Sequence, residues 1–277
     1  MAERIELAGA TAKLYRDGPT WDGQPTATIA HLRCDTVDAG ADLLIDILAK
    51  LKRDGIVRVL GPMEGDTWHS YRLVCETDGS APFLMEPTSR PNDRFAFAKA
   101  GFVTVAEYFS ARAPVEATSM PDLPSGVTLQ TWDGENPEAH FSEVHALSSR
   151  AFAQNLFYKP LTLDAFLELY MPFAPLLVRE LILLARNSDG ELLGYLFGIP
   201  DYSQKPADRA VILKTYASLE AGLGHAMATS FHNAAFDLGY REAIHALIQD
   251  DNRSAERSRL HGGEIFRRYA LMGWRGA

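Results

Sequence analysis

The spacing of hydrophobic residues in the first part of the chain predicts a strand, a helix and a second strand. Residues 26–34 alternate between apolar and polar side chains, as in a half-buried strand. In the following segment, 41–55, apolar residues fall on one helical stripe that ends at Gly55: Leu43, Leu44, Ile47, Leu48 and Leu51. Residues 56–62 then return to a strand pattern.

The second half repeats this order with an additional hairpin. Residues 182–200 form two β-rich runs around an Asn-Ser-Asp-Gly turn, and residues 209–218 predict a third strand. A helix follows with apolar residues every three to four positions: Leu223, Met227, Phe231, Ala234 and Leu238. With the strand at 242–248, these elements predict a βαβ crossover, whose first loop lies at the carboxyl end of a strand, where α/β proteins bind ligands.

The length of 277 residues allows one large domain or two smaller ones. A Pro-rich stretch at 111–126 separates two segments that resemble each other in pattern, because each has a helix followed by a strand and later a second such pair. We therefore expect a first module at 1–112, a linker at 113–126 and a second module at 127–277.

Composition and charge narrow the classes of function. The net charge of −9 argues against general binding to nucleic acid or to an anionic membrane. Only Cys34 and Cys75 occur, so neither a disulfide framework nor a cysteine-based zinc site is expected. Charges near the N-terminus do not fit a signal peptide, and no apolar segment is long enough to span a bilayer. We expect a cytoplasmic protein, as a monomer or homodimer.

The turn between the strand at 209–218 and its helix is the most informative segment. Gly222 and Gly224 stand where a helix begins, so backbone N–H groups and the helix dipole favour a phosphate. The alternative interpretation is that the two glycines only permit a tight turn. A dinucleotide site is a further alternative, since Asp250 or Asp251 could end the next strand, but Met227 occupies its third small position.

The segments VILKTYASLEAGLGHAM and IHALIQDDNRSAERSRLHGGEIFRRYALM resemble the acyl-CoA site of the GNAT superfamily of N-acetyltransferases. The resemblance covers about residues 127–275, and residues 1–110 look like a degenerate copy of the same fold. It implies an α/β (α+β) fold of two GNAT-like modules, each a mixed central sheet flanked by helices, with a βαβ acyl-CoA-binding core in the second module.

The resemblance also implies which residues hold acetyl-CoA. The backbone of Lys214, Thr215 and Tyr216 would pair with the pantetheine arm, the amides of Ala221, Gly222, Leu223, Gly224 and His225 would hold the pyrophosphate, and Asn252 would contact the pantetheine side. The chain departs from the family pattern at Leu219, where Arg or Gln is usual, and at Arg259, where a Tyr is frequent. The first module offers only Gly40 at the equivalent loop, so we expect no cofactor there.

Acetyl transfer to an amine requires a base, an oxyanion donor and a proton for the departing thiolate. Tyr216 and Tyr269 are candidate acids, and His245 is a candidate base, although each also fits a hydrogen-bonded residue of the core. His225 and His232 lie seven residues apart on one helix without an evident third ligand, so no metal site is expected.

Three aromatic residues are candidates for binding the acceptor: Phe157 and Tyr158 between two predicted helices, and Trp68 in the first module. Packing in the core is the alternative for all three. Positive charge that suits CoA phosphates is concentrated near the end of the chain, at Arg253, Arg257, Arg259, Arg267 and Arg268.

We therefore expect an N-acetyltransferase that uses acetyl-CoA and a small-molecule primary amine. A non-catalytic CoA-binding or regulatory protein is the main alternative, and an NAD(P)-dependent oxidoreductase is a remote one.

Overall fold

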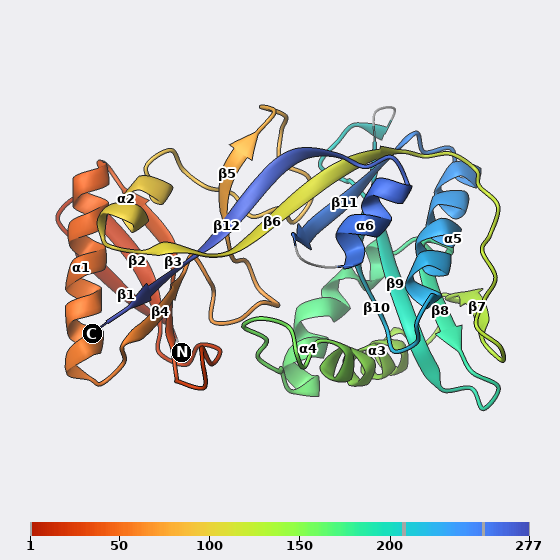
Figure 1. The fold of residues 1–277 in the computed structure, drawn as a ribbon, viewed down its shortest axis with the longest axis horizontal. Coiled ribbons are helices and arrows are strands. Elements are labelled where there is room, and N and C mark those ends of the chain that lie inside the picture. Colours follow the sequence, from red (N-terminus) through yellow and green to blue (C-terminus); the bar gives the residue numbers. More distant parts are fainter. Residues whose placement is uncertain (1, 207–208, 251–252, 277) are drawn as a thin grey trace. The chain divides into compact units, whose positions relative to one another are not determined.

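The structure, a computed structural model, describes residues 2–206, 209–250 and 253–276 (Figure 1). Contacts within the chain group it into two compact units. Unit 1 comprises residues 1–108, 155–159 and 267–277, and unit 2 comprises residues 109–154 and 160–266. The sequence-based division differs from these units mainly at the end of the chain, because it assigns residues 267–277 to the second module.

Unit 1 is a mixed sheet with two helices. Its strands are β1 (Ala2–Leu7), β2 (Ala10–Tyr15), β3 (Ala27–Cys34), β4 (Arg58–Gly61) and β5 (Leu73–Thr77), together with the first half of β6 (Val103–Pro114) and most of β12 (Glu264–Arg275). The strand order is β1, β2, β3, β4, β12, β6, and β5 pairs with β12. β3 and β4 are parallel, and β12 runs antiparallel to β4. The helices are α1 (Val37–Arg53) and α2 (Asp93–Lys99).

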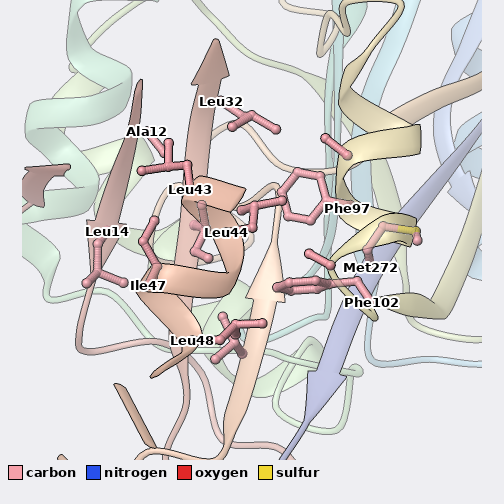
Figure 2. Close-up of a cluster of buried hydrophobic side chains, with 14 of the residues drawn as sticks. Ala12, Leu14, Leu32, Leu43, Leu44, Ile47, Leu48, Phe97, Phe102 and Met272 are labelled. Atoms are coloured by element: carbon pink, nitrogen blue, oxygen red, sulfur yellow. The ribbon is translucent and has the colours of Figure 1, made fainter. Parts of the chain in front are cut away.

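The core of unit 1 lies under α1. Thr36 caps this helix by accepting a hydrogen bond from the amide of Ala39, and the predicted stripe from Leu43 to Leu51 is buried. Figure 2 shows α1 side chains pointing towards the strands, with Phe97 of α2 and Met272 of β12 beside them. Residues as far apart in the sequence as Leu43 and Met272 thus belong to one core, and β12 contributes to it.

Unit 2 is a mixed sheet with helices on both faces. It begins with the second half of β6 and continues with β7 (Thr128–Thr131), α3 (Pro137–Ala151), α4 (Leu163–Tyr170), two short 3-10 helices (Met171–Leu176 and Arg179–Leu181), β8 (Ile182–Arg186), β9 (Leu192–Pro200), β10 (Val211–Ser218), α5 (Leu223–Asp237), β11 (Glu242–Gln249) and α6 (Arg253–Leu260). The strand order is β6, β11, β10, β9, β8, β7.

Local sequence explains the central elements of unit 2. The predicted hairpin is present as β8 and β9, and the side chain of Asn187 accepts hydrogen bonds from the amides of Asp189 and Glu191 in its turn. Leu223, Met227 and Phe231 of the predicted α5 stripe are buried against β8, β9 and β10. Leu238, also predicted on this stripe, is exposed, because α5 ends there. The strands predicted at 26–34, 56–62, 209–218 and 242–248 are present as β3, β4, β10 and β11.

The first residues of the Pro-rich stretch belong to β6. β6 extends through the first residues of the expected linker and ends at Pro114, because its second half pairs within the sheet of unit 2. Among the residues that the structure describes, no helix combines the length and the apolar character that crossing a membrane requires.

Candidate functional site

The predicted βαβ crossover of unit 2 consists of β10, α5 and β11. The parallel register of β10 and β11 runs from Val211 opposite Ala243 to Leu213 opposite His245. On its other edge, β10 stays antiparallel to β9 as far as Ser218. That register shifts between Leu213 and Thr215, so Lys214 is the extra residue of a β-bulge. Pairing with β11 thus covers only the first part of β10.

β11 changes direction shortly after this register ends. Leu247 has a φ of 58°, a left-handed conformation that a leucine rarely adopts. Its amide donates a hydrogen bond of 3.0 Å to Oγ of Ser110 on β6, the strand on the other side of β11 in the sheet order. β10 and β11 therefore pair only along their first halves. The unpaired second halves lead to the carboxyl ends of the strands, where ligands of α/β proteins bind.

The turn after β10 leaves the first amides of α5 without a capping side chain. Gly222 precedes the helix with a φ of 83°, and no side chain caps this helix end. A Cβ at Gly222 would meet no atom within 4 Å. Uncapped amides at a helix N-terminus carry partial positive charge, so this turn suits an anion.

Arg257 of α6 lies over the same helix end. A Cβ at Gly224 would come within 2.5 Å of the guanidinium, so any side chain at this position would displace Arg257 from its place. The guanidinium donates a hydrogen bond of 3.2 Å to the Tyr216 hydroxyl, and that hydroxyl donates one of 2.8 Å to Ser254 of α6. No carboxylate in the described part of the chain forms an ion pair with Arg257. A cation beside the positive end of α5 lacks a counter-charge that an anionic ligand would supply.

The candidate base His245 is part of a buried hydrogen-bond chain. Its Nε2 lies 2.9 Å from Nε2 of His232, and its Nδ1 lies 2.8 Å from Oγ of Ser258. Burial is the main cause that lowers the pKa of His245 to about 4 and that of His232 to about 3. Both rings are therefore neutral at pH 7, and both nitrogens of His245 are engaged with protein groups.

The three candidate acceptor residues are in unit 1, since residues 155–159 belong to it. Trp68 and Tyr158 meet edge to face with ring centroids 6.0 Å apart, and Nε1 of Trp68 donates to the carbonyl of Lys159. Phe157 is buried and meets Trp21 edge to face at 5.8 Å. The sequence placed Phe157 and Tyr158 in the second module, so the structure assigns them to a different unit from the one expected.

Other predicted residues are placed away from the α5 turn or are outside the described residues. Asn252 and Asp251 lie outside the residues that the structure describes. Arg267 is buried in unit 1, where it pairs with Glu86, and the hydroxyl of Tyr269 donates to the same carboxylate. Arg267 and Tyr269 are thus parts of a buried network of unit 1.

Three residues of the site were not selected from the sequence: Ser254, Ser258 and His261. Ser254 and Ser258 are four residues apart on α6 and so share one face of the helix. This i, i+4 spacing was the available signal. His261 follows α6, and its ring stacks on that of His232 with centroids 4.2 Å apart. Nothing in the sequence places it near a residue that lies 29 positions earlier.

The arrangement of β10, β11, the Gly222 turn and Arg257 fits an acyl-CoA. The end of the β10–β11 register matches a site for an extended chain, the turn at Gly222 is not covered by other atoms, and Arg257 supplies a cation there. The side chain of Leu223 is buried in the core, so only its amide is available at the turn.

Comparisons with known proteins identify the fold. The sequence matches no protein-family model and no curated protein. The structure is similar to that of a GCN5-related N-acetyltransferase from Sphaerobacter thermophilus, with a TM-score of 0.58 and 13% identity over 96% of this chain and 76% of that chain. A tandem GNAT protein from the clavulanic acid biosynthesis pathway matches with a TM-score of 0.55 and 16% identity, covering 97% of this chain and 79% of that one.

A third structure agrees with these two. It is a GCN5-related N-acetyltransferase from Anabaena variabilis, with a TM-score of 0.56 and 12% identity over 95% of this chain and 58% of that chain. At such identities the similarity concerns the fold. The chain therefore has the fold of the GCN5-related N-acetyltransferases, and its match along nearly its whole length to a tandem GNAT protein agrees with a tandem arrangement.

Proposed function

We propose that unit 2 binds acetyl-CoA and transfers its acetyl group to a primary amine of a small molecule or amino-acid derivative. The observation that carries this proposal is the uncapped N-terminus of α5 with Arg257 over Gly224. It lies directly after β10, the strand whose pairing with β11 ends in mid-length. The fold of the similar structures supports the same class of reaction.

The chain supplies three kinds of contact to this ligand. The backbone of Lys214, Thr215 and Tyr216 would hold the pantetheine arm as an additional strand. The amides from Ala221 to Gly224 and the Arg257 guanidinium would hold the pyrophosphate, whereas the amide of His225, also expected there, donates to the carbonyl of Gly222. Asn252, by the family resemblance, would contact the pantetheine side.

The bound thioester supplies an activated acetyl group. In the overall reaction the acceptor nitrogen bonds to the acetyl carbon, the carbon–sulfur bond breaks, and a proton from the amine ends on the thiolate. An amide of β10 near Thr215 or Tyr216 would donate to the carbonyl oxygen as negative charge develops on it. The Tyr216 hydroxyl is the candidate that returns a proton to the thiolate, and it would have to give up its hydrogen bond to Ser254 to do so.

His245 has a different place in this proposal. Its two ring nitrogens face His232 and Ser258, so a substrate proton has no direct access to either of them in this arrangement. We propose that an ordered water accepts the proton of the amine instead. Trp68, Phe157 and Tyr158 remain the candidates for contact with the acceptor.

Binding is tested first by thermal shift of the full chain with CoA, acetyl-CoA and NAD(P). A ligand at one hundred times its Kd should stabilise the protein by about 2.7 kcal/mol. We expect this from both CoA forms, and Arg257→Gln should weaken CoA binding about 10- to 100-fold, because hydrogen bonds to charged groups contribute roughly 1.5–3 kcal/mol. Arg259→Gln is the matched control, since Arg259 is exposed on the same helix.

Transfer is tested separately, by following thiol release from acetyl-CoA over a panel of amines. Gly224→Asp places a carboxylate against Arg257 and should abolish both CoA binding and thiol release. Stabilisation by NAD(P) alone would contradict the proposal. Binding of CoA without thiol release for any amine would favour a non-catalytic CoA-binding protein.

A further inference from the structure

Four histidines of unit 2 form one cluster, although they come from three separate segments. His225 and His232 belong to α5, His245 to β11, and His261 to the turn after α6. The rings of His232 and His261 stack face to face at 4.2 Å, with an interplanar angle of 3°. The centroid of His261 is also 6.0 Å from that of His225 and 6.2 Å from that of His245. We call these four residues the histidine cluster.

The histidine cluster holds α6 in place. Ser258 of α6 bonds to His245, and His261 at the end of α6 stacks on His232. One turn before Ser258, Ser254 accepts the hydrogen bond of Tyr216 on β10. α6 is therefore attached to both strands of the crossover. Because α6 carries Arg257, these contacts also fix the guanidinium over Gly224.

The charges around the cluster offer no compensation for a proton. The groups whose charge acts on these rings are the other histidines: His245 and His261 act on His232, His261 acts on His245, and His225 acts on His261. On α6, Arg257, which contacts Tyr216, is also a cation. On β6, Arg112 lies against Glu242 at the start of β11. No carboxylate in the described residues contacts the four rings.

The hydrogen bonds of the cluster also depend on neutral rings. Nε2 of His232 and Nε2 of His245 lie 2.9 Å apart, so only one of them can carry a hydrogen. A second proton would set two N–H donors against each other. Nε2 of His261 is buried and has no hydrogen-bond partner, so a charge on this ring would be poorly solvated.

A metal ion is not the better explanation of this cluster. Within the described residues, no group of histidine, cysteine, aspartate and glutamate side chains is arranged to hold one. The face-to-face stack of His232 and His261 gives the reason, because ligands of one ion direct their nitrogens to a common point instead of packing ring on ring.

We propose that the histidine cluster is a pH-sensitive latch on α6, in which His232 and His245 are positioning residues that hold Arg257 at the α5 N-terminus. Protonation of the cluster releases α6 and with it the guanidinium that we assign to the pyrophosphate. The part that concerns the ligand rests on the proposed function, whereas the release of α6 does not.

The direction of the pH effect follows from linkage. Burial and neighbouring histidines hold the pKa values of His232, His245 and His261 below the ordinary value. In a state with α6 released, these rings meet water and titrate near 6.5. The released state therefore binds more protons below about pH 6.5, and acid favours it.

Hydrogen exchange of the full chain tests the latch without any ligand. Each histidine that becomes exposed on opening should raise the opening equilibrium of residues 253–260 about fourfold between about pH 7.5 and about pH 6.0, and two should raise it more than tenfold. The exchange is corrected for the intrinsic effect of pH on amides. Opening that does not change with pH would overturn the proposal.

A variant and its control separate titration from simple loss of packing. His232→Gln keeps an amide nitrogen near the Nε2 position but cannot titrate, so the pH effect on opening should be about fourfold smaller. His145→Gln is the control, because His145 of α3 uses its Nε2 to contact the carbonyl of Leu161 outside the cluster. If His232→Gln does not fold, NMR titration of the wild-type protein tests the same point. Titration of His232 and His245 near pH 6.5 in the folded protein would contradict the latch.

Affinity for 3′-dephospho-CoA connects the latch to the site. This probe has no titrating terminal phosphate, so a pH effect on its binding comes from the protein. We expect weaker binding at about pH 6.0 than at about pH 7.5 in the wild type, and a smaller change in His232→Gln. Absence of binding at every pH would contradict the proposed function alone, whereas binding that is equal at both pH values would contradict the latch.

Discussion

The two units contain the same crossover, but the N-termini of their crossover helices differ in what occupies them. In unit 2 the turn before α5 is open and uncapped. In unit 1 the Thr36 hydroxyl accepts a hydrogen bond from the amide of Ala39 and so satisfies the start of α1. A Cβ at Gly40 would come within 2.9 Å of the side chains of Ala96 and Cys34. The helix end of unit 1 is therefore packed against protein.

The gap between the two parallel strands differs in the same way. Beyond Thr28 and Leu60, where the register of β3 and β4 ends, the amide of Met63 donates to the carbonyl of Ile29. A Cβ at Gly61 would lie 2.6 Å from the ring of Phe97. Unit 1 thus fills with its own backbone and an aromatic side chain the region that corresponds to the proposed ligand site of unit 2. One backbone topology permits either outcome, and a few side chains decide between them.

The largest effect that tests this comparison comes from Phe97→Ala. Phe97 is fully buried and packs edge to face on Phe102 at 5.0 Å, so its removal should cost about 3–5 kcal/mol of unfolding free energy in urea. Phe95→Ala is the control, because Phe95 is 62% exposed on the same helix. Equal losses in the two variants would show that Phe97 does not fill the gap.

Acid should weaken the protein through unit 2. The folded pKa of His245 is about 4 and the unfolded value is near 6.5, so its contribution is complete above about pH 6.5 and is lost as pH falls towards 4. The loss is roughly 3 kcal/mol for this residue in urea unfolding. The contribution of His69 in unit 1 to stability changes with pH in the opposite direction, because its hydrogen bond to Asp66 raises its pKa. This contribution is present in acid and is lost as pH rises. A His69→Asn variant should therefore keep the acid sensitivity, and a His232→Gln variant should reduce it.

A smaller effect comes from Gly222→Ala. The φ of 83° should cost about 1–2 kcal/mol with a Cβ present, although the space around it is empty. Gly239→Ala, at a φ of 86° after α5 and also in open space, should cost the same. Only Gly222→Ala should also weaken CoA binding by calorimetry. If both variants bind CoA equally well, the cradle does not include this turn.

The sequence predicts the strands and helices whose hydrophobic period is regular. The stripe of α1, the hairpin around Asn187 and the crossover through α5 are all present, because each depends on contacts between residues close in the chain. The resemblance to the GNAT fold also agrees with the similar structures. The resemblance points to the backbone of Lys214, Thr215 and Tyr216, but the end of the β10–β11 register and the bulge at Lys214 follow from no pattern of hydrophobicity.

The contacts of the site depend on residues far apart in the sequence, and so the sequence alone could not rank them. Five arginines looked equivalent, yet Arg257 lies over Gly224 whereas Arg267 pairs with a buried glutamate of unit 1. The third and fourth members of the histidine cluster come from β11 and from the end of α6. Tertiary packing selects among such candidates, which is why their roles required the structure.

The position of β12 also has a consequence for synthesis. Its residues Met272 to Arg275 pair with β4, and Met272 belongs to the core under α1. During synthesis, the first 108 residues therefore leave the ribosome while one edge of β4 is still unpaired, because β12 has not yet been made. Unit 1 can complete its sheet only after residue 275 has emerged, so the unit that begins first is the one that finishes last.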